Sequence, residues 1–347
     1  MKILILASSR YAPTYNEKLK KQVAYINAFD NIEAELYNDL PLYEIEKKLL
    51  THTYDCVLPY VVFDYTHEEQ FPFAFNTALY QILLYHNQEF IGSDLYTQML
   101  LNDKALTSQR SGMGLSNIII TRVLWENERE TAYNMLLSSR IKWPSIIKPN
   151  TLSASLGISS ESIVFSPKEA ELVIDKQFLE FRGLSEILVE EYLQNAREYT
   201  VSVTGNGLNV ITCATAMVPK NGNYTIYSFQ SKNLPAEERP LTYCSVEDIQ
   251  LKRRLEDCAK ELASKFQLRD YCRFDFLVYE NIIYLIDANT IPSLGFNYMY
   301  EYTSNGMIRL EQLLALLLYV FSKRTKISLP QALVDALPIQ FRMQIDD

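Results

Sequence analysis

The sequence predicts a mixed α/β chain whose C-terminal part is better described as α+β. Residues 1–95 alternate short apolar stretches with helix-patterned ones, which is typical of a parallel sheet flanked by helices. Residues 186–325 instead hold several strand-patterned stretches around one long amphipathic helix. At 347 residues the chain exceeds one ordinary core. We therefore expect three domains, 1–95, 96–185 and 186–325, followed by a tail, 326–347.

The composition excludes several classes of partner. A net charge of −9 gives no support to binding of nucleic acid or of an acidic membrane, both of which require basic patches. The longest apolar run, Leu313–Phe321, is far shorter than the ~20 residues of a membrane span. Five scattered cysteines without CxxC spacing are typical of free thiols in a reducing compartment. We expect a cytoplasmic protein that binds neither nucleic acid nor membrane.

The N-terminal domain is expected to alternate strands and helices. In order these are the strand Ile3–Ala7, the helix Tyr15–Phe29, the strands Glu33–Tyr37 and Tyr54–Val62, the helix Phe73–Tyr85 and the short strand Glu89–Ile91. Ligands of parallel sheets bind beyond the carboxyl ends of the strands. Two polar stretches occupy such ends, Ser8–Arg10 and Tyr60–Asp64. They are either ordinary polar loops or part of a ligand site, and the sequence leaves both open.

The middle of the chain continues with helices and strands. Ser93 or Asp94 is expected to cap a helix that carries Lys104. The strands near Asn117–Val123 and Ser145–Lys148, the helix Glu128–Ser138 and the helix Lys168–Glu180 follow. Lys148 opens the polar loop NTLSASLGIS, in which Gly157 and small hydroxyl residues let backbone N–H groups approach an anion. An ordinary solvated helix would have the same pattern as the helix of Lys104, and an ordinary surface loop the same pattern as this polar loop. Each signal is therefore weak by itself.

The C-terminal part is dominated by strands. We expect the strands Glu186–Leu193 and Thr200–Thr204, an extended section over Val210–Met217 and Asn223–Ser231, the helix Val246–Gln267, a hairpin over Tyr271–Gly295, the helix Met307–Ser322 and a short helix Leu329–Leu337. Glycine is scarce, with ten residues, and no GxGxxG motif or GxxxxGKS/T motif occurs. Neither Rossmann nor P-loop nucleotide binding is therefore supported.

The hairpin, YCRFDFLVYENIIYLIDANTIPSLG, carries the strongest chemical signal. Residues two apart on a strand share a face. This groups polar side chains from both strands, namely Arg273, Asp275, Asp287 and Asn289. If the tight turn at Tyr279–Asn281 is centred on Asn281, Asp275 faces Asp287 and Arg273 faces Asn289.

Two opposed carboxylates need a cation between them. Facing Cβ atoms lie ~4.5–5.5 Å apart, where like charges are destabilising. Hard oxygen ligands without cysteine or histidine suit Mg²⁺, which takes one or two carboxylates plus substrate phosphates. Two alternatives stay open: a solvated face whose acids never meet, or acids that Arg273 alone balances. A shift of register by one residue would also break the pairing.

Taken together, these stretches resemble the ATP-grasp fold and, within it, the D-alanine–D-alanine ligase family. The matching segments, in the family's order, are GSD…NDK around Lys104, PSIIKP…SASLGIS, ILVEEYL…REYTV, SKNL, and RFDF…IDANTIPSLG. The similarity spans roughly residues 90–300. It extends less clearly to the N-terminal domain, which would be the pre-ATP-grasp domain.

The resemblance implies an ATP site. Lys104 and Lys148 would contact the phosphates, and Glu198 the ribose hydroxyls. Of the neighbouring pair Glu190 and Glu191, Glu190 would lie by the adenine amine. The loop Ser153–Gly157 would close over the phosphates, with Ser153 among the nucleotide contacts and Ser155 matching the family's second loop serine.

The resemblance also implies a reaction centre. Lys232 would neutralise the transferred phosphoryl group and Arg273 would steady the tetrahedral intermediate, so that both, with Ser155, are expected to be catalytic. The residues expected to hold two Mg²⁺ ions are Asp275, Asp287 and Asn289.

The sequence departs from the family's pattern mainly where substrate is recognised. Asp287 stands where glutamate is usual, and Ser293 replaces the glycine after the proline. Ala154, Asn233 and Tyr298 replace a loop serine, a tyrosine and the serine that receives the second D-alanine. The N-terminal loop, SSRYAPTYNE, lacks the glutamate of the HEVS-like motif.

These observations predict an ATP-dependent, ADP-forming carboxylate–amine ligase that acts through an acyl phosphate on small molecules other than D-alanine. Two alternatives are left open: a ligase that loads an amino acid on the thiol of a carrier protein, and a catalytically inactive nucleotide-binding regulator. Because the ligases of the family are commonly homodimers, the resemblance also implies a homodimer.

Overall fold

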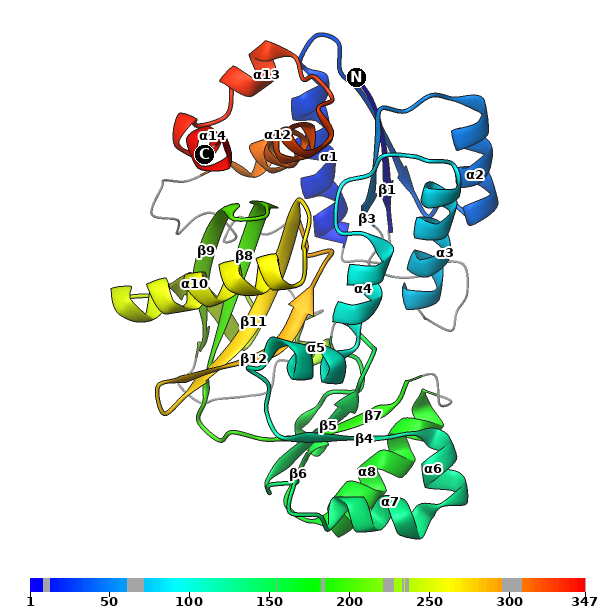
Figure 1. The fold of residues 1–347 in the computed structure, drawn as a ribbon, viewed down its shortest axis with the longest axis vertical. Helices are drawn as coiled ribbons and strands as arrows, with labels where there is room; N and C mark the ends of the chain where they lie inside the picture. The colour runs from blue at the N-terminus through cyan, green and yellow to red at the C-terminus, as the bar shows by residue number, and fades with distance from the viewer. Residues whose placement is uncertain are drawn as a thin grey trace.

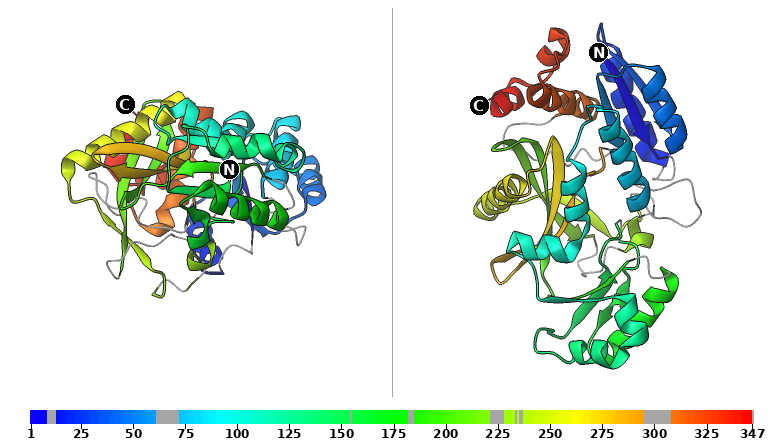
Figure 2. Two further views of the ribbon diagram at one scale, coloured as in Figure 1. Left: turned by 90° about the horizontal axis from the view of Figure 1, so that it is seen from below. Right: turned by 45° about the vertical axis from the view of Figure 1, so that its right-hand side comes forward.

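The computed structural model describes residues 1–8, 13–60, 72–153, 155–181, 185–220, 228–232, 234, 237–294 and 308–346. Within them, three sheets form three parts of the molecule (Figure 1). A parallel sheet lies near the N-terminus, a five-stranded sheet in the middle, and a four-stranded sheet with its own helices at the end remote from both termini (Figure 2).

The N-terminal sheet is parallel, as expected, with strand order β2-β1-β3. The elements are β1 (Lys2–Ala7), α1 (Pro13–Asn27), β2 (Glu33–Asn38), α2 (Leu42–Thr51), β3 (Cys56–Tyr60) and α3 (Pro72–Tyr85). The apolar run Ile3–Leu6 of the central strand is fully buried. The helix α2 was not expected, and the expected strand Glu89–Ile91 is reduced to one parallel bridge between Phe90 and Val57.

The four-stranded sheet has the order β4-β7-β5-β6, and its pairs are antiparallel. This part contains α4 (Leu95–Asn102), α5 (Lys104–Ser111), β4 (Asn117–Ile120), α6 (Arg122–Asn127), α7 (Arg129–Leu136), β5 (Ser145–Pro149), the 3₁₀ turn Ser160–Ser162, β6 (Ile163–Val164), α8 (Pro167–Glu180) and β7 (Ile187–Glu191). One sheet face packs Ile118, Ile147 and Val189 against the three helices α6–α8. The opposite face carries Lys148 and Glu190.

The single helix expected around Lys104 is wrong, because it is two helices. Asp94 caps α4 by accepting a hydrogen bond from the N–H of Thr97 at 2.9 Å. Asp103 caps α5 in the same way, accepting from Leu106 at 2.9 Å, so that Lys104 is the first residue of the second helix. Asp103 fits the pattern of a helix interior in the sequence, but in the structure it is the N-cap at which α5 begins.

The five-stranded sheet, β10-β9-β8-β11-β12, is antiparallel throughout. Its part comprises β8 (Arg197–Asn206), β9 (Asn209–Pro219), α9 (Phe229–Lys232), β10 (Leu241–Ser245), α10 (Ile249–Lys265), β11 (Tyr271–Tyr279) and β12 (Ile282–Asn289). The long helix α10 covers one face, where Leu255, Ala259 and Phe274 share a core (Figure 2). The extended section expected to end at Ser231 is wrong at its end, because Phe229–Lys232 is helical. The preceding residues 223–227 lie outside the described ranges.

The C-terminal helices pack against both the N-terminal part and the five-stranded sheet. They are the 3₁₀ turn Leu310–Gln312, α12 (Leu313–Thr325), α13 (Gln331–Asp335) and α14 (Ile339–Asp346). All nine residues Leu313–Phe321 are buried, in one core with β1 and β3. A helix that is apolar all round must be covered on every side, which this position provides. None of the helices in the described ranges is both long and apolar enough to cross a membrane.

The hairpin pairs as expected, with one correction. Its turn is Glu280–Asn281, both at positive φ (47° and 64°), which is the geometry of a two-residue hairpin turn. Phe276 pairs with Leu285 but Asp275 pairs with Asp287, so that Ile286 is an extra residue, a β-bulge. The expected pairing of Asp275 with Asp287 and of Arg273 with Asn289 is therefore confirmed, although the turn is not centred on Asn281.

Candidate functional site

Arg273 and Asp275 form a two-pronged ion pair on the face of the five-stranded sheet opposite α10. The guanidinium donates from Nε to Oδ1 at 2.8 Å and from Nη2 to Oδ2 at 2.7 Å. Thr200, which lies opposite on β8, donates its hydroxyl to Oδ1 at 2.7 Å. Both partners of the ion pair are largely buried. Arg273 therefore compensates one of the two facing carboxylates, and Asp287 is the other.

Lys148 and Glu190 form a second buried ion pair, on the polar face of the four-stranded sheet. The ammonium and carboxylate are 2.6 Å apart, and the side chains are only 8% and 4% exposed. The pairing of β5 with β7 explains the contact, since Glu190 lies opposite Ile146, two residues before Lys148. Residues two apart share a face, so both charges lie on the side away from α6–α8.

Lys104 begins α5 and reaches into the loop after β5. Its Nζ donates to the carbonyl of Leu152 at 2.6 Å and to that of Asn150 at 3.2 Å. Burial lowers the pKa of Lys104, opposed by the Asp287 carboxylate and reinforced by the charge of Lys148. Charged residues of both sheets thus affect the pKa of Lys104.

Glu198 and Lys232 are also coupled to this group of charges. Burial, with Asp275 as the next cause, raises the pKa of Glu198 to about 7, against the influence of Lys232. Burial and the nearby Arg273 lower the pKa of Lys232. A cluster of strongly shifted titratable groups is a frequent property of functional sites.

The structure thus gathers most of the predicted site residues between the two sheets. The charged members are Lys104, Lys148, Glu190, Glu198, Lys232, Arg273, Asp275 and Asp287. Asn289 shares the hairpin face through its position opposite Arg273, and its side-chain oxygen accepts from the N–H of Ile291 at 2.9 Å. We name these nine residues the charge cluster.

Glu191 lies elsewhere. It is adjacent to Glu190 on β7 and therefore points to the other face of the sheet. Its carboxylate pairs with Lys142 at 3.2 Å. Its side chain is accordingly not among those that converge, and the alternation of the strand was the signal that could have separated the two glutamates.

The loop after β5 holds Ser153 and Ser155. Ser155 has φ +62°, and its carbonyl accepts from the N–H of Ile158 at 3.1 Å. A Cβ at Gly157 would come within 2.7 Å of the Phe181 ring and 2.8 Å of Pro149, so only glycine fits this turn. The loop is therefore folded closely against β5, whereas Ala154 lies outside the described residues.

The residues that could hold Mg²⁺ are Asp275, Asp287 and Asn289, two carboxylates and an amide oxygen. This set suits a hard cation that completes its coordination with phosphate oxygens. In the described part of the chain, no three side chains from His, Cys, Asp and Glu gather closely enough to hold a metal ion by themselves. A cation held by these three residues would therefore need further oxygen ligands from elsewhere.

The end of the hairpin is held by the N-terminal part, a connection that sequence reasoning missed. Gln22 on α1 donates to the carbonyl of Leu294 at 2.7 Å, and the Tyr60 hydroxyl accepts from the N–H of Leu294 at 2.8 Å. Ser8 is buried at the end of β1. The remaining predicted substrate-side positions, residues 9–10, 61–64, Asn233 and Tyr298, lie outside the described residues.

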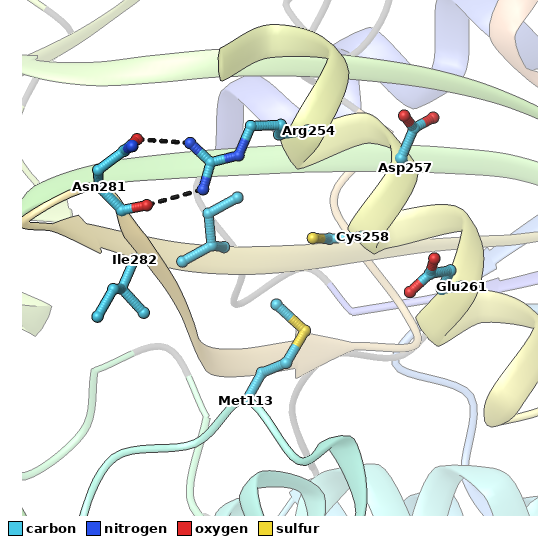
Figure 3. A pocket seen from close by; sticks show the side chains of 8 residues that line it. Met113, Arg254, Asp257, Cys258, Glu261, Asn281 and Ile282 are labelled. Carbon is cyan, nitrogen blue, oxygen red and sulfur yellow. Dashed lines mark hydrogen bonds between the residues drawn. The ribbon is translucent and has the colours of Figure 1, made fainter. Parts of the chain in front are cut away.

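A shallow pocket of ≈ 450 Å³ lies on the other side of the five-stranded sheet, between α10 and β12 (Figure 3). Arg254 at its rim donates to the side chain of Asn281 at 2.5 Å and to its carbonyl at 2.7 Å. Cys258, Asp257 and Glu261 line the α10 side. Because the charge cluster uses the opposite face, this pocket is separate from it.

Comparison with known sequences shows what the chain is similar to. Residues 109–318 match the family model described as D-ala D-ala ligase C-terminus. A D-alanine–D-alanine ligase of Helicobacter pylori (strain HPAG1) is 26% identical over 224 residues, which cover 64% of this chain and 60% of the relative. One from Campylobacter jejuni (serotype O:2) is 26% identical over 227 residues, covering 62% and 58%. The match thus spans about three fifths of the length of these curated relatives.

Solved structures share the whole fold. A D-alanine–D-alanine ligase from Bacillus anthracis superposes with a TM-score of 0.66 at 16% identity, covering 94% of this chain and 99% of its own. A D-Ala:D-Ser ligase from Enterococcus faecalis gives 0.65 at 15% identity, covering 92% and 99%. These likenesses confirm the expected ATP-grasp fold with its N-terminal α/β domain. Because the family model covers more than half of the sequence, the chain belongs to the family that carries the D-Ala–D-Ala ligase C-terminal domain.

Proposed function

We propose that the chain is an ATP-dependent, ADP-forming ligase that joins a small-molecule carboxylate to an amine through an acyl phosphate. The observation that supports this most directly is the charge cluster. Four cations, Lys104, Lys148, Lys232 and Arg273, gather with Asp275 and Asp287 between two sheets. Phosphoryl transfer depends on positioning and charge neutralisation more than on covalent catalysis, and these are the groups that it requires.

The chemistry follows from the poor reactivity of a carboxylate, whose leaving group would be oxide. Transfer of the γ-phosphoryl group of ATP to a carboxylate oxygen releases ADP and gives an acyl phosphate. The amine then attacks the carbonyl carbon, loses a proton, and phosphate leaves. In this scheme Lys104 and Lys148 hold the phosphates, Lys232 neutralises the transferred group and Arg273 steadies the tetrahedral intermediate.

Asp275, Asp287 and Asn289 would hold Mg²⁺ that arrives with ATP. When bound, the metal neutralises charge on the phosphate oxygens. Asp275 already accepts three hydrogen bonds, from Arg273 and Thr200. These bonds fix the orientation of its carboxylate before a ligand arrives, which reduces the reorganisation that binding requires.

We further propose that the substrates are not two D-alanine molecules, even though the curated relatives are named D-alanine–D-alanine ligases. Asp287 is one methylene shorter than the glutamate usual in the family, and Ser293 replaces a glycine next to Leu294. Leu294 is itself held from the N-terminal part by Gln22 and Tyr60. We propose that the small-molecule acid binds between this segment and Arg273. We also propose that the enzyme is cytoplasmic.

The test is release of ADP in the presence of Mg²⁺, measured with pairs of candidate acids and amines, D-alanine among them. Release of ADP that requires both substrates together supports the proposed activity. A preference for D-alanine as both acid and amine would refute the proposal that the substrates are not two D-alanine molecules. Bound ATP without turnover across a broad panel would favour a nucleotide-binding regulator. Turnover that requires a carrier-protein thiol would favour the loading reaction. Lys232→Ala should abolish turnover in a ligase but leave a regulator's nucleotide-dependent function unchanged.

A further inference from the structure

Asn150, which the proposed function does not use, connects the two predicted phosphate lysines. It follows Lys148 by two residues at the end of β5 and is fully buried. Its side-chain Oδ1 accepts a hydrogen bond from the N–H of Ala105 at 3.0 Å. Its main-chain carbonyl accepts from the N–H of Lys104 at 3.3 Å and from the Lys104 ammonium at 3.2 Å. One residue thus makes three bonds to the start of α5.

These bonds join parts of the molecule that otherwise belong to different cores. Lys148 lies on the four-stranded sheet, and the N–H of Asn150 continues the pairing there by donating to the carbonyl of Glu186 at 2.8 Å. The segment around α5 instead packs toward the five-stranded sheet, where Leu101 and Met113 contact its core. The separation of Lys104 from Lys148 therefore depends in part on the link at Asn150, beside the bond from Lys104 to Leu152.

The two ends of the Asn150 side chain differ in their hydrogen bonding. The N–H of Ala105 is one of the first donors of α5, which have no partner within the helix, and Asn150 Oδ1 satisfies it. The other end, Nδ2, is buried and has no hydrogen-bond partner among the described residues. What the amide contributes is therefore the acceptor, directed at the helix start beside Lys104.

We propose that Asn150 is a positioning residue for the nucleotide phosphates, acting through Lys104. It fixes the start of α5 against the end of β5 and thereby sets the distance between the two lysine ammonium groups. This inference rests on the proposed function, because it assumes that both lysines bind ATP phosphates. A merely structural cap would affect stability alone, without discriminating between ligands with and without phosphates.

The experiment measures the affinity of the full chain for two probes by calorimetry: AMP-PNP with Mg²⁺, which carries phosphates, and adenosine, which carries none. Asn150→Ala should weaken AMP-PNP binding about tenfold, as expected for loss of one buried acceptor, and change adenosine binding less than about twofold. Should the alanine variant not fold, Asn150→Ser keeps a polar but shorter side chain and carries the same expectation.

Asn102→Ala is the matched control. Asn102 ends α4 and donates to the carbonyl of Thr151 at 2.9 Å, so it joins the same two segments without touching Lys104. It should leave the ratio of the two affinities unchanged. Equal losses of both probes in the Asn150 variants, or an equal change of the ratio in Asn102→Ala, would overturn the inference.

A double-mutant cycle tests whether Asn150 acts through the lysine. In a Lys104→Ala background, Asn150→Ala should change AMP-PNP binding no further, because the group that it positions is gone. Independent, additive effects would overturn the inference alone. If the unchanged protein binds neither probe, the proposed function fails and the inference fails with it.

Discussion

Asp275 lies opposite Asp287 across the hairpin, and the extra residue Ile286 makes this pairing compatible with the two-residue turn. Arg273 compensates Asp275 by two hydrogen bonds, whereas the charge of Asp287 opposes the lowering of the Lys104 pKa. The same principle holds elsewhere in the charge cluster, since Glu190 compensates Lys148 and two carbonyls accept from Lys104. Within each of the two sheets, an ion pair thus compensates part of the charge before a nucleotide binds.

Asp287→Asn should weaken the binding of the Mg²⁺ that accompanies the nucleotide. The substitution keeps the shape but removes one of two carboxylates, so the Mg²⁺ concentration for half-maximal AMP-PNP binding should rise about tenfold. The measurement is a Mg²⁺ titration at fixed nucleotide. Asp257→Asn is the control, since Asp257 is an exposed acid on α10, beyond the opposite face of the sheet. Identical titrations of Asp287→Asn and the unchanged protein would contradict the metal assignment.

Glu190→Gln should destabilise the fold strongly. The Lys148 ammonium would stay buried without its carboxylate, and breaking a buried pair costs about 3–5 kcal/mol. Urea unfolding measures the loss. The neighbour offers a matched control, because Glu191 pairs with a lysine that is 64% exposed. Glu191→Gln should cost less than about 1 kcal/mol. Equal losses would show that the Lys148–Glu190 pair is not buried in solution.

Glu198 should make stability depend on pH. Burial raises its pKa to about 7 in the folded chain, above the ~4.3 of an unfolded glutamate. The folded state therefore binds the proton more tightly, so this contribution is complete below the unfolded pKa and is lost as the pH rises through about 7. Glu198→Gln removes the titration. Its free energy of unfolding relative to the unchanged protein should increase from about pH 5 to about pH 8, measured by urea unfolding. A pH-independent difference would show that Glu198 titrates normally.

The hairpin shows how far sequence reasoning reached and where it stopped. Period-two alternation and a polar turn are local signals, and they predicted which side chains face each other. The bulge at Ile286 could not be predicted, because an isoleucine in a strand looks the same whether it pairs or is extra. The cluster itself required the resemblance, since Lys104 and Lys148 come from segments that only tertiary packing brings together.

The errors have physical reasons as well. Asp103 reads as one polar residue in a continuous helix pattern, yet it caps α5 and breaks the helix at this point. Glu190 and Glu191 were predicted together although neighbours on a strand must point apart. Asn150 carries no pattern at all, because its three bonds to Lys104 and Ala105 depend on two distant elements meeting.

Tyr60→Phe tests whether the N-terminal part holds the end of the hairpin. The Tyr60 hydroxyl is the acceptor for the buried N–H of Leu294 at 2.8 Å. Its removal should cost about 1–3 kcal/mol of stability, because the N–H loses its partner away from water.

Tyr54→Phe is the matched control, since the Tyr54 hydroxyl bonds the half-buried Glu35 at 3.2 Å and not Leu294. Urea unfolding compares the two variants, and amide hydrogen exchange at Leu294 should become faster only in Tyr60→Phe. Unchanged exchange at Leu294 would mean that Gln22, which donates to the carbonyl of the same residue, holds the segment by itself. Faster exchange would place Tyr60 among the groups that join the N-terminal part to the strand of Asp287 and Asn289.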